Sequence, residues 1–124
     1  MKNLKILIAE DDEPSSQLIS FYVQTFGKEI IYVRTGTDAV EACHNHPDID
    51  LILMDIRMIE MNGFEATRQI REFNKKVIIF AQSSYALTGA REMAINAGYT
   101  DYISKHIKRD KLIALIQRYF ENKI

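Results

Sequence analysis

Acidic, hydroxyl and basic side chains follow short apolar segments at four places in the sequence. These side chains are Glu10 and Asp11 after KILIA, Asp55 after LILM, Ser83 after VIIFAQ, and Lys105 after YIS. Two carboxylates about 5 Å apart repel each other by roughly 3 kcal/mol at an effective dielectric constant near 20. An acidic cluster of this kind either holds a proton or recruits a cation. Because its ligands would all be oxygen atoms, Mg2+ fits better than Zn2+, and Mn2+ is possible in its place.

A divalent cation at this cluster would let an anionic phosphoryl group approach Asp55. The carboxylate could then act as a nucleophile and form an acyl phosphate, while Lys105 and a serine hydroxyl donate to the phosphoryl oxygens. Each feature also has an ordinary structural interpretation. The run EDDE before Pro14 suits a helix N-terminus, and the other residues could be cap, loop or surface residues. Their independent placement after separate apolar segments favours the phosphoryl site.

The elements that must position these residues alternate along the chain. Short β-rich apolar runs predict strands at residues 5–9, 29–33, 51–54, 77–81 and 102–104. Several of these runs lack polar alternation, as expected for strands covered on both faces. Helical periodicity between them predicts these apolar faces: Leu18, Ile19, Tyr22, Val23 and Phe26; Ala39, Val40 and Cys43; Phe64, Ile70 and Phe73; Ala90, Met93, Ala94 and Ala97; Leu112, Ile113, Ile116, Tyr119 and Phe120. The pattern predicts an α/β fold of five βα units with a parallel sheet. Its functional crevice lies outside the carboxyl ends of the strands.

Composition narrows the class of protein. The chain has 124 residues, 16 basic against 17 acidic, and a formal net charge of −1, so no general electrostatic argument favours nucleic acid or a membrane. No apolar stretch approaches the roughly 20 residues of a membrane span. Cys43 is the only cysteine, which excludes an internal disulfide and favours a reducing compartment. We expect one cytoplasmic domain, residues 1–124, with no membrane contact and no direct nucleic-acid binding.

Four segments together resemble the receiver domains of two-component response regulators: ILIAEDD, LILMDIRMIEMNGFEATRQIR, IIFAQSSYAL and DYISK. The resemblance extends over essentially the whole chain and is closest in style to the receivers of hybrid histidine kinases. It implies a flavodoxin-like (βα)5 fold with a five-stranded parallel sheet in the order 2-1-3-4-5. It also implies a phosphorelay switch that takes a phosphoryl group from a phosphohistidine of a sensor kinase or histidine phosphotransfer domain.

The resemblance gives each matching position a role. Asp55 would be the phosphoacceptor, and Glu10 and Asp11 the acidic pair that binds Mg2+ with it, so that Asp12 falls outside the pair. Ser83 and Lys105 would contact the phosphoryl group. The backbone carbonyl of Arg57 would complete the metal ligands, Tyr102 would change rotamer on activation, and Arg57 and Tyr85 would tune the lifetime of the acyl phosphate. A downstream partner would read the face formed by helix four, strand five and helix five.

Two positions depart from the family pattern. Ile59 stands where receivers commonly have proline, in a loop rich in methionine (Met54, Met58 and Met61). His106 stands where the lysine is usually followed by proline in a cis peptide bond. A cis bond costs more before a residue other than proline, so both isomers of the Lys105–His106 bond remain open.

Several functional classes can be compared with these residues. A phosphatase of the haloacid dehalogenase type would carry a second Asp where Arg57 stands, and the acidic residues 10–13 would repel the phosphate of a flavin. A phosphorylation-independent interaction scaffold is the serious alternative, because of Ile59 and His106. As a switch, the domain would assist its own phosphorylation without being a conventional enzyme. The basic residues Lys108, Arg109 and Lys111 are interpreted as the polar start of the last helix.

Overall fold

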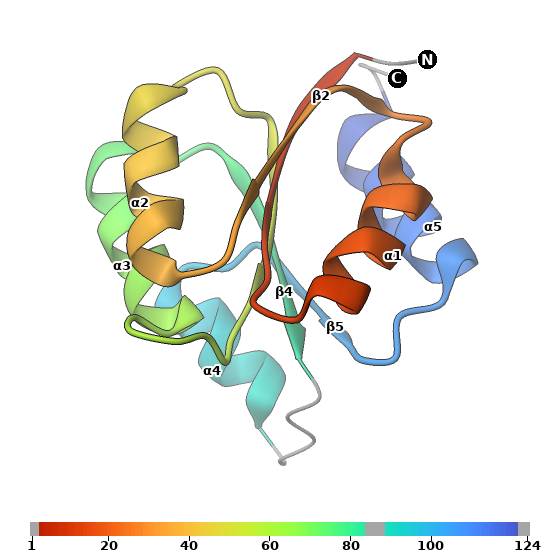
Figure 1. Ribbon diagram of the computed structural model, residues 1–124. Coiled ribbons are helices and arrows are strands. Elements are labelled where there is room, and N and C mark those ends of the chain that lie inside the picture. Colours follow the sequence, from red (N-terminus) through yellow and green to blue (C-terminus); the bar gives the residue numbers. More distant parts are fainter. Residues whose placement is uncertain (1–2, 84–88, 122–124) are drawn as a thin grey trace.

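Five strands alternate with five helices in the computed structural model, which describes residues 3–83 and 89–121 (Figure 1). The strands are β1 (Leu4–Ala9), β2 (Gly27–Val33), β3 (Leu51–Asp55), β4 (Ile78–Ser83) and β5 (Asp101–Ser104). The helices are α1 (Glu13–Val23), α2 (Gly36–Asn45), α3 (Gly63–Phe73), α4 (Ala90–Ala97) and α5 (Arg109–Phe120). Within the described residues, no helix is both long and apolar enough to cross a lipid bilayer.

The strands form one parallel sheet in the order β2-β1-β3-β4-β5. Helices α1 and α5 cover one face of the sheet, and α2, α3 and α4 cover the other (Figure 1). The predicted flavodoxin-like topology is therefore confirmed. Because every pair of neighbouring strands is parallel, all five carboxyl ends lie at the same edge of the sheet.

Two separate cores explain why the apolar runs lack polar alternation. In β1, Leu7 and Ala9 pack towards α2, α3 and α4, whereas Ile6 and Ile8 pack towards α1 and α5. All six residues of β1 and all five of β3 are buried. Successive side chains of a strand point to opposite faces, so a strand covered on both sides must be apolar at nearly every position.

Three residues predicted on apolar helix faces are substantially exposed, which is a correction. Leu18 and Met93 are each 48% exposed, and Phe73 is 40% exposed. The Phe73 ring stacks on His44 of α2, with ring centroids 3.7 Å apart, because it lies in the last turn of α3 beside the end of α2. Helical periodicity gives the direction of a side chain but does not show whether another element covers it.

Asp101 joins three elements at the start of β5. Its carboxylate accepts from Arg91 Nη1 of α4 at 2.7 Å, from Tyr119 Oη of α5 at 2.8 Å, and from the Tyr102 backbone N–H at 2.8 Å. Burial alone would raise the pKa of Asp101, but these donors outweigh it and hold the pKa below its usual value.

We expect Asp101→Asn to lower the free energy of unfolding at pH 7 by roughly 1–3 kcal/mol. A depressed folded-state pKa contributes stability above the unfolded pKa of about 3.9, and this stability is lost as the pH falls through the folded pKa. The wild-type and variant stabilities should therefore converge at acidic pH. Urea unfolding from pH 7 to pH 3 measures this, and a difference that stays constant with pH would contradict it.

Candidate functional site

Three carboxylates and one lysine converge at the carboxyl edge of the sheet. Glu10 follows β1, Asp55 ends β3 and Lys105 follows β5. Glu10, Asp11 and Asp55 each offer an oxygen, and these atoms all lie within 4.8 Å of one another. Lys105 Nζ donates to Glu10 Oε1 at 2.6 Å and to Asp55 Oδ2 at 3.3 Å. The structure thus brings together four of the predicted site residues.

Burial and mutual repulsion perturb these groups. Burial raises the pKa of Glu10, and Asp55 adds to this effect while Lys105 opposes it. Burial also raises the pKa of Asp11, as does neighbouring Glu10. Burial disfavours the Lys105 ammonium, but the hydrogen bond to Glu10 and the charge of Asp55 outweigh it, so its pKa is raised. One ammonium faces three carboxylates, which leaves the site suited to a further cation.

The acidic residues 10–13 form two groups: Glu10 and Asp11 belong to the site, and Asp12 and Glu13 belong to the start of α1. Asp12 is the N-cap of α1: its Oδ2 accepts from the Ser15 backbone N–H at 3.0 Å. Glu13 lies in the first turn, where a carboxylate suits the helix dipole. The backbone N–H of Asp12 donates to Glu10 Oε2 at 3.2 Å and so orients that carboxylate. The metal-ligand and helix-cap interpretations therefore apply to different residues of the same run.

Gly63, which the sequence places at a helix boundary, and Tyr99, which the sequence did not single out, hold the backbone of Asp55 in place. Gly63 donates its N–H to Ile56 O at 2.8 Å, and the buried Tyr99 hydroxyl lies 3.5 Å from Asp55 O. A Cβ atom on Gly63 would lie 2.0 Å from Tyr99 Oη and 2.3 Å from Asp55 O. Only glycine therefore lets α3 begin this close to the end of β3.

The loop between β3 and α3 is anchored to its neighbour. Ile59 forms a parallel bridge with Thr35, the N-cap of α2, although its side chain is 65% exposed. Gly36 packs against Met61, whose carbonyl oxygen would lie 2.2 Å from a Cβ atom there. Met54 is buried within β3 and does not belong to the loop as expected. Ile59 therefore occupies the position of the usual proline in a loop that is tied down by other contacts.

Ser83 and Lys105 meet through the backbone. Ser83 is the last residue of β4, is fully buried, and is in register with Ser104. Its carbonyl oxygen accepts from the Lys105 backbone N–H at 2.8 Å. The peptide bond between Lys105 and His106 is cis, which answers the question that the sequence left open.

The remaining predicted residues have different surroundings. Arg57 is exposed, and its backbone N–H donates to Asp55 Oδ1 at 3.3 Å. Tyr102 is partly buried and packs against the core on the α4 side of the sheet. Tyr85 lies outside the described residues.

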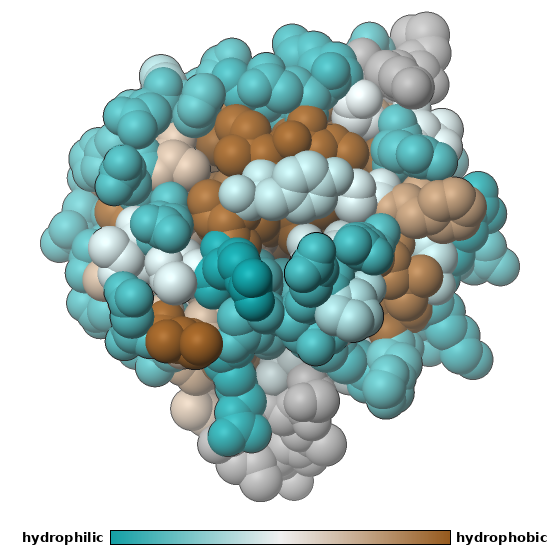
Figure 2. All heavy atoms as spheres, viewed as in Figure 1, coloured by the Kyte–Doolittle hydropathy of each residue, from teal (hydrophilic) through white to brown (hydrophobic). Residues whose placement is uncertain are grey.

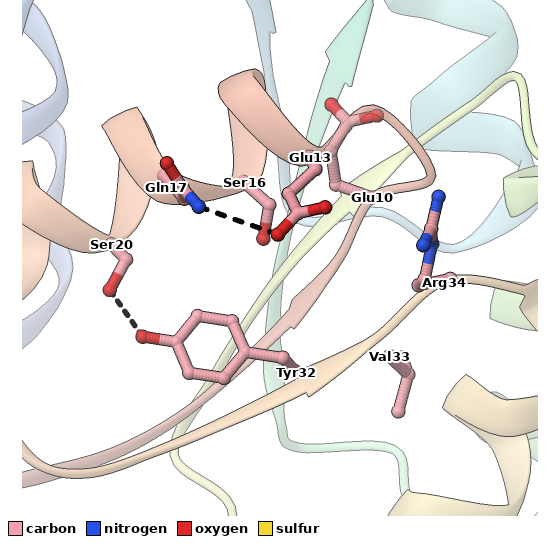
Figure 3. Close-up of a pocket in the computed structure, with 8 residues that line it drawn as sticks. All are labelled: Glu10, Glu13, Ser16, Gln17, Ser20, Tyr32, Val33 and Arg34. Atoms are coloured by element: carbon pink, nitrogen blue, oxygen red, sulfur yellow. Dashed lines mark hydrogen bonds between the residues drawn. The ribbon is translucent and has the colours of Figure 1, made fainter.

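A pocket of about 320 Å³ opens beside the acidic cluster, between α1 and β2 (Figure 3). Glu10 and Glu13 lie at one end, and the Tyr32 and Ser20 hydroxyls contact each other at the other. Arg34, which no sequence pattern singled out, lines the pocket and donates Nη2 to Asp11 O at 3.0 Å. The arginine fixes the backbone of Asp11 while leaving its carboxylate available.

The donor set fits a hard divalent cation. All three acidic residues offer oxygen atoms, and two of them are almost fully buried, with Glu10 1% and Asp55 5% exposed. Mg2+ prefers carboxylate oxygen and water ligands to nitrogen or sulfur. The Lys105 ammonium lies in the same cluster of carboxylates. Because the Lys105 side chain is 18% exposed, the cluster stays open to solvent and to a cation.

The structure is a doubly wound five-stranded parallel sheet with acidic residues at the carboxyl ends of its first and third strands and a lysine after its fifth. The family model described as the response regulator receiver domain matches residues 6–117. The chain belongs to this family.

Relatives include hybrid kinases and short regulators. The chain is 34% identical over 125 residues to hybrid signal transduction histidine kinase L of Dictyostelium discoideum, covering 95% of this chain but 7% of that protein. It is 32% identical over 117 residues to the polar-differentiation response regulator DivK of Brucella ovis, covering 92% of this chain and 94% of that protein.

A solved structure supports the same family assignment. The receiver domain of sensor histidine kinase PA1611 from Pseudomonas aeruginosa is 34% identical, has a TM-score of 0.85, and covers 94% of this chain and 97% of that domain. That structure has a magnesium ion coordinated in its active site cleft. The expected similarity to receivers of hybrid histidine kinases is confirmed.

Proposed function

We propose that this chain, residues 1–124, is one receiver domain that accepts a phosphoryl group on Asp55 in a Mg2+-dependent reaction and acts as a signalling switch. The observation that carries the proposal is the meeting of Lys105 Nζ with Asp55 Oδ2 at 3.3 Å inside a cluster of three carboxylates. A scaffold that needs no phosphorylation would gain nothing from burying these like charges together.

The phosphoryl donor is a phosphohistidine of a sensor kinase or histidine phosphotransfer domain. A carboxylate oxygen of Asp55 attacks the phosphorus, a P–O bond forms, the P–N bond breaks, and the imidazole leaves with the electron pair. Glu10, Asp11, Asp55 and the Arg57 backbone carbonyl would hold Mg2+, which when bound neutralises charge on the transferred oxygens. Lys105 donates to the same oxygens, so the domain assists its own phosphorylation.

The switch follows from the added charge. An acyl phosphate brings about two negative charges and new acceptor oxygens, towards which Ser83 and Lys105 move. Tyr102 packs against the core on the α4 side of the sheet. It changes rotamer as Ser83 and Lys105 move, so that one of two arrangements of the domain is favoured. Arg57 and Tyr85 tune the lifetime of the acyl phosphate by restricting access of water.

The phosphodonor docks on α1. Leu18 and Phe21 of this helix are 48% and 61% exposed, and Figure 2 shows hydrophobic atoms at the right-hand side of the α1 region, next to polar ones. Leu18 lines a small pocket together with Lys105, His106 and Ile107. A donor that covers this apolar surface would present its phosphohistidine to the neighbouring Asp55. In a solved complex, the yeast histidine phosphotransfer protein Ypd1 binds the receiver domain of Ssk1, a precedent at the level of the fold.

We expect Leu18→Ala/Phe21→Ala to slow phosphotransfer from a phosphorylated histidine phosphotransfer domain by at least about tenfold, because exposed anchors of this kind contribute over 1 kcal/mol. Phosphorylation by acetyl phosphate, which needs no docking surface, should be unchanged. Met93→Ala is the control, since Met93 is equally exposed but lies on α4. Equal slowing with both donors would show that the change disturbs the site and not docking.

A downstream protein binds the face formed by α4, β5 and α5. A groove of about 360 Å³ lies there, with Ile103 and Leu115 among its lining residues. Its basic lining residues are Arg91, Lys108, Lys111 and Arg118. Lys108 and Lys111, interpreted from the sequence as the polar start of a helix, therefore also belong to a basic groove. Charge complementarity favours an acidic protein segment as the partner, and the domain needs no direct contact with nucleic acid or a membrane.

The test of the proposed function is phosphorylation by acetyl phosphate, followed by intact mass. With Mg2+ the chain should gain one phosphoryl group, and with EDTA in place of Mg2+ the gain should fall at least about a hundredfold, because three carboxylates then repel the donor. Mn2+ should restore it. If neither acetyl phosphate nor phosphohistidine donors add a phosphoryl group under rapid quenching, the chain is an interaction scaffold.

The scaffold alternative is weakened by the two residues that motivated it. The loop carrying Ile59 is bridged to Thr35, and Lys105 reaches Asp55 although His106 follows it. We also propose a cytoplasmic location, because Cys43, the only cysteine in the sequence, is a buried free thiol, as is usual in a reducing compartment.

A further inference from the structure

Gln82 is a buried polar residue that the phosphorylation chemistry described above does not use. It lies in β4 and is 1% exposed. Neither Nε2 nor Oε1 has a hydrogen-bond partner in the described part of the chain. A buried amide without partners costs free energy comparable to that of a lost hydrogen bond, so its presence in a buried strand requires a compensating role.

The register of the sheet places Gln82 beside the phosphoacceptor. Gln82 is the direct partner of Asp55 on β3 and of Ile103 on β5. Two residues earlier, Leu53 and Phe80 pack in the core beneath α1 and α5. Because side chains two apart share a face, the side chains of Asp55 and Gln82 are neighbours on that face. The amide is therefore within a side chain's length of the carboxylate.

Lys105 passes over Gln82. The strand order puts β4 between β3 and β5, and Lys105, which follows β5, reaches Asp55 of β3 and Glu10 beyond β1. Its side chain must therefore cross the carboxyl end of β4, where Gln82 lies. The ammonium is held by Glu10 at 2.6 Å, and the Gln82 amide below it has no hydrogen-bond partner among residues 3–83 and 89–121.

We propose that Gln82 is a further phosphoryl-binding residue, whose Nε2 donates to a phosphoryl oxygen on Asp55 while its Oε1 accepts from the Lys105 ammonium. This inference rests on the proposed function and adds a residue to its site. Phosphorylation supplies the missing acceptor, and Lys105 turns from Glu10 towards the new oxygens. The unpaired amide thus disfavours the unphosphorylated arrangement and its pairing stabilises the phosphorylated one.

The test compares Gln82→Met with wild type, using Mg2+ and beryllium fluoride, which mimics a phosphoryl group on a carboxylate. Methionine keeps the volume and removes the amide. We expect the melting temperature of the ligand-free variant to rise by a few degrees, and its dissociation constant for beryllium fluoride to rise roughly tenfold. In wild type, the side-chain NH2 resonance of Gln82, assigned by its absence from the variant, should shift on addition of beryllium fluoride.

Controls separate this role from a structural one. Gln117→Met changes an exposed glutamine of α5 and should alter neither the melting temperature nor the dissociation constant. Gln82→Leu provides a second variant if Gln82→Met folds poorly.

An unchanged dissociation constant for beryllium fluoride in the folded Gln82 variants overturns the inference and indicates that only water forms hydrogen bonds with the Gln82 amide. If wild type binds no beryllium fluoride and accepts no phosphoryl group, the proposed function fails and the inference fails with it. If wild type does both but the Gln82 resonance stays still, only the inference is overturned.

Discussion

Asp55→Asn is expected to abolish the Mg2+-dependent gain of one phosphoryl group, with no product of this mass detected by rapid quench and intact-mass measurement. The amide of asparagine is a poor nucleophile and cannot form the acyl phosphate. The change also removes one of the three charges that repel one another within 4.8 Å, so the unphosphorylated variant should be at least as stable as wild type. Loss of reaction in a well-folded protein would then be chemical in origin.

Asp12→Asn is the matched control for this experiment. Asp12 neighbours the acidic pair but caps α1, and asparagine caps a helix as well as aspartate does. Phosphorylation of Asp12→Asn should be close to that of wild type. A phosphoryl gain that survives in Asp55→Asn would exclude Asp55 as the only acceptor, and a gain that disappears equally in both variants would show that its loss is not specific to Asp55.

Gly63→Ala is expected to destabilise the fold by about 3 kcal/mol, which lowers the melting temperature by roughly 10 °C. The added methyl group would lie 2.0 Å from Tyr99 Oη, 2.3 Å from Asp55 O and 3.0 Å from Ile56 Cα. Two of these atoms belong to backbone, so relief requires α3 or the end of β3 to move. Phosphorylation should fall as well, because the movement displaces Asp55. Thermal unfolding and acetyl phosphate labelling measure the two effects.

Gly27→Ala tests whether loss of glycine alone is responsible. A Cβ atom there meets only side-chain carbons of Ile30 and Ile6, at 3.0 Å or more, and these can rotate. Its effect on the melting temperature should be much smaller and phosphorylation should be unaffected. Gly63→Ala with wild-type stability and labelling would mean that α3 can shift without disturbing Asp55.

Much of the fold could be predicted from local patterns. Residues such as those of LKILIA and LILMD are apolar at nearly every position, which is typical of strands covered on both faces, and 3.6-residue periodicity between them requires helices on both sides of a parallel sheet. The placement of Glu10, Asp11, Asp55 and Lys105 at one edge follows from that topology, because parallel strands end together. The exposure of the Leu18, Met93 and Phe73 side chains could not be predicted, because it depends on whether another helix or strand packs against them.

The sequence by itself determined the alternation of strands and helices along the chain and the chemical types of residue at the strand ends, because these depend on short-range periodicity; the order of the strands in the sheet was implied only by the resemblance to receiver domains. Only the tertiary structure decided which atoms meet: Gly63 against Tyr99, Arg34 on the backbone of Asp11, and Lys105 across the end of β4 above Gln82. Such contacts join residues far apart in the chain, with Lys105 and Glu10 separated by 95 positions. Their distances follow from the packing of whole helices against the sheet, which no local pattern of residues encodes.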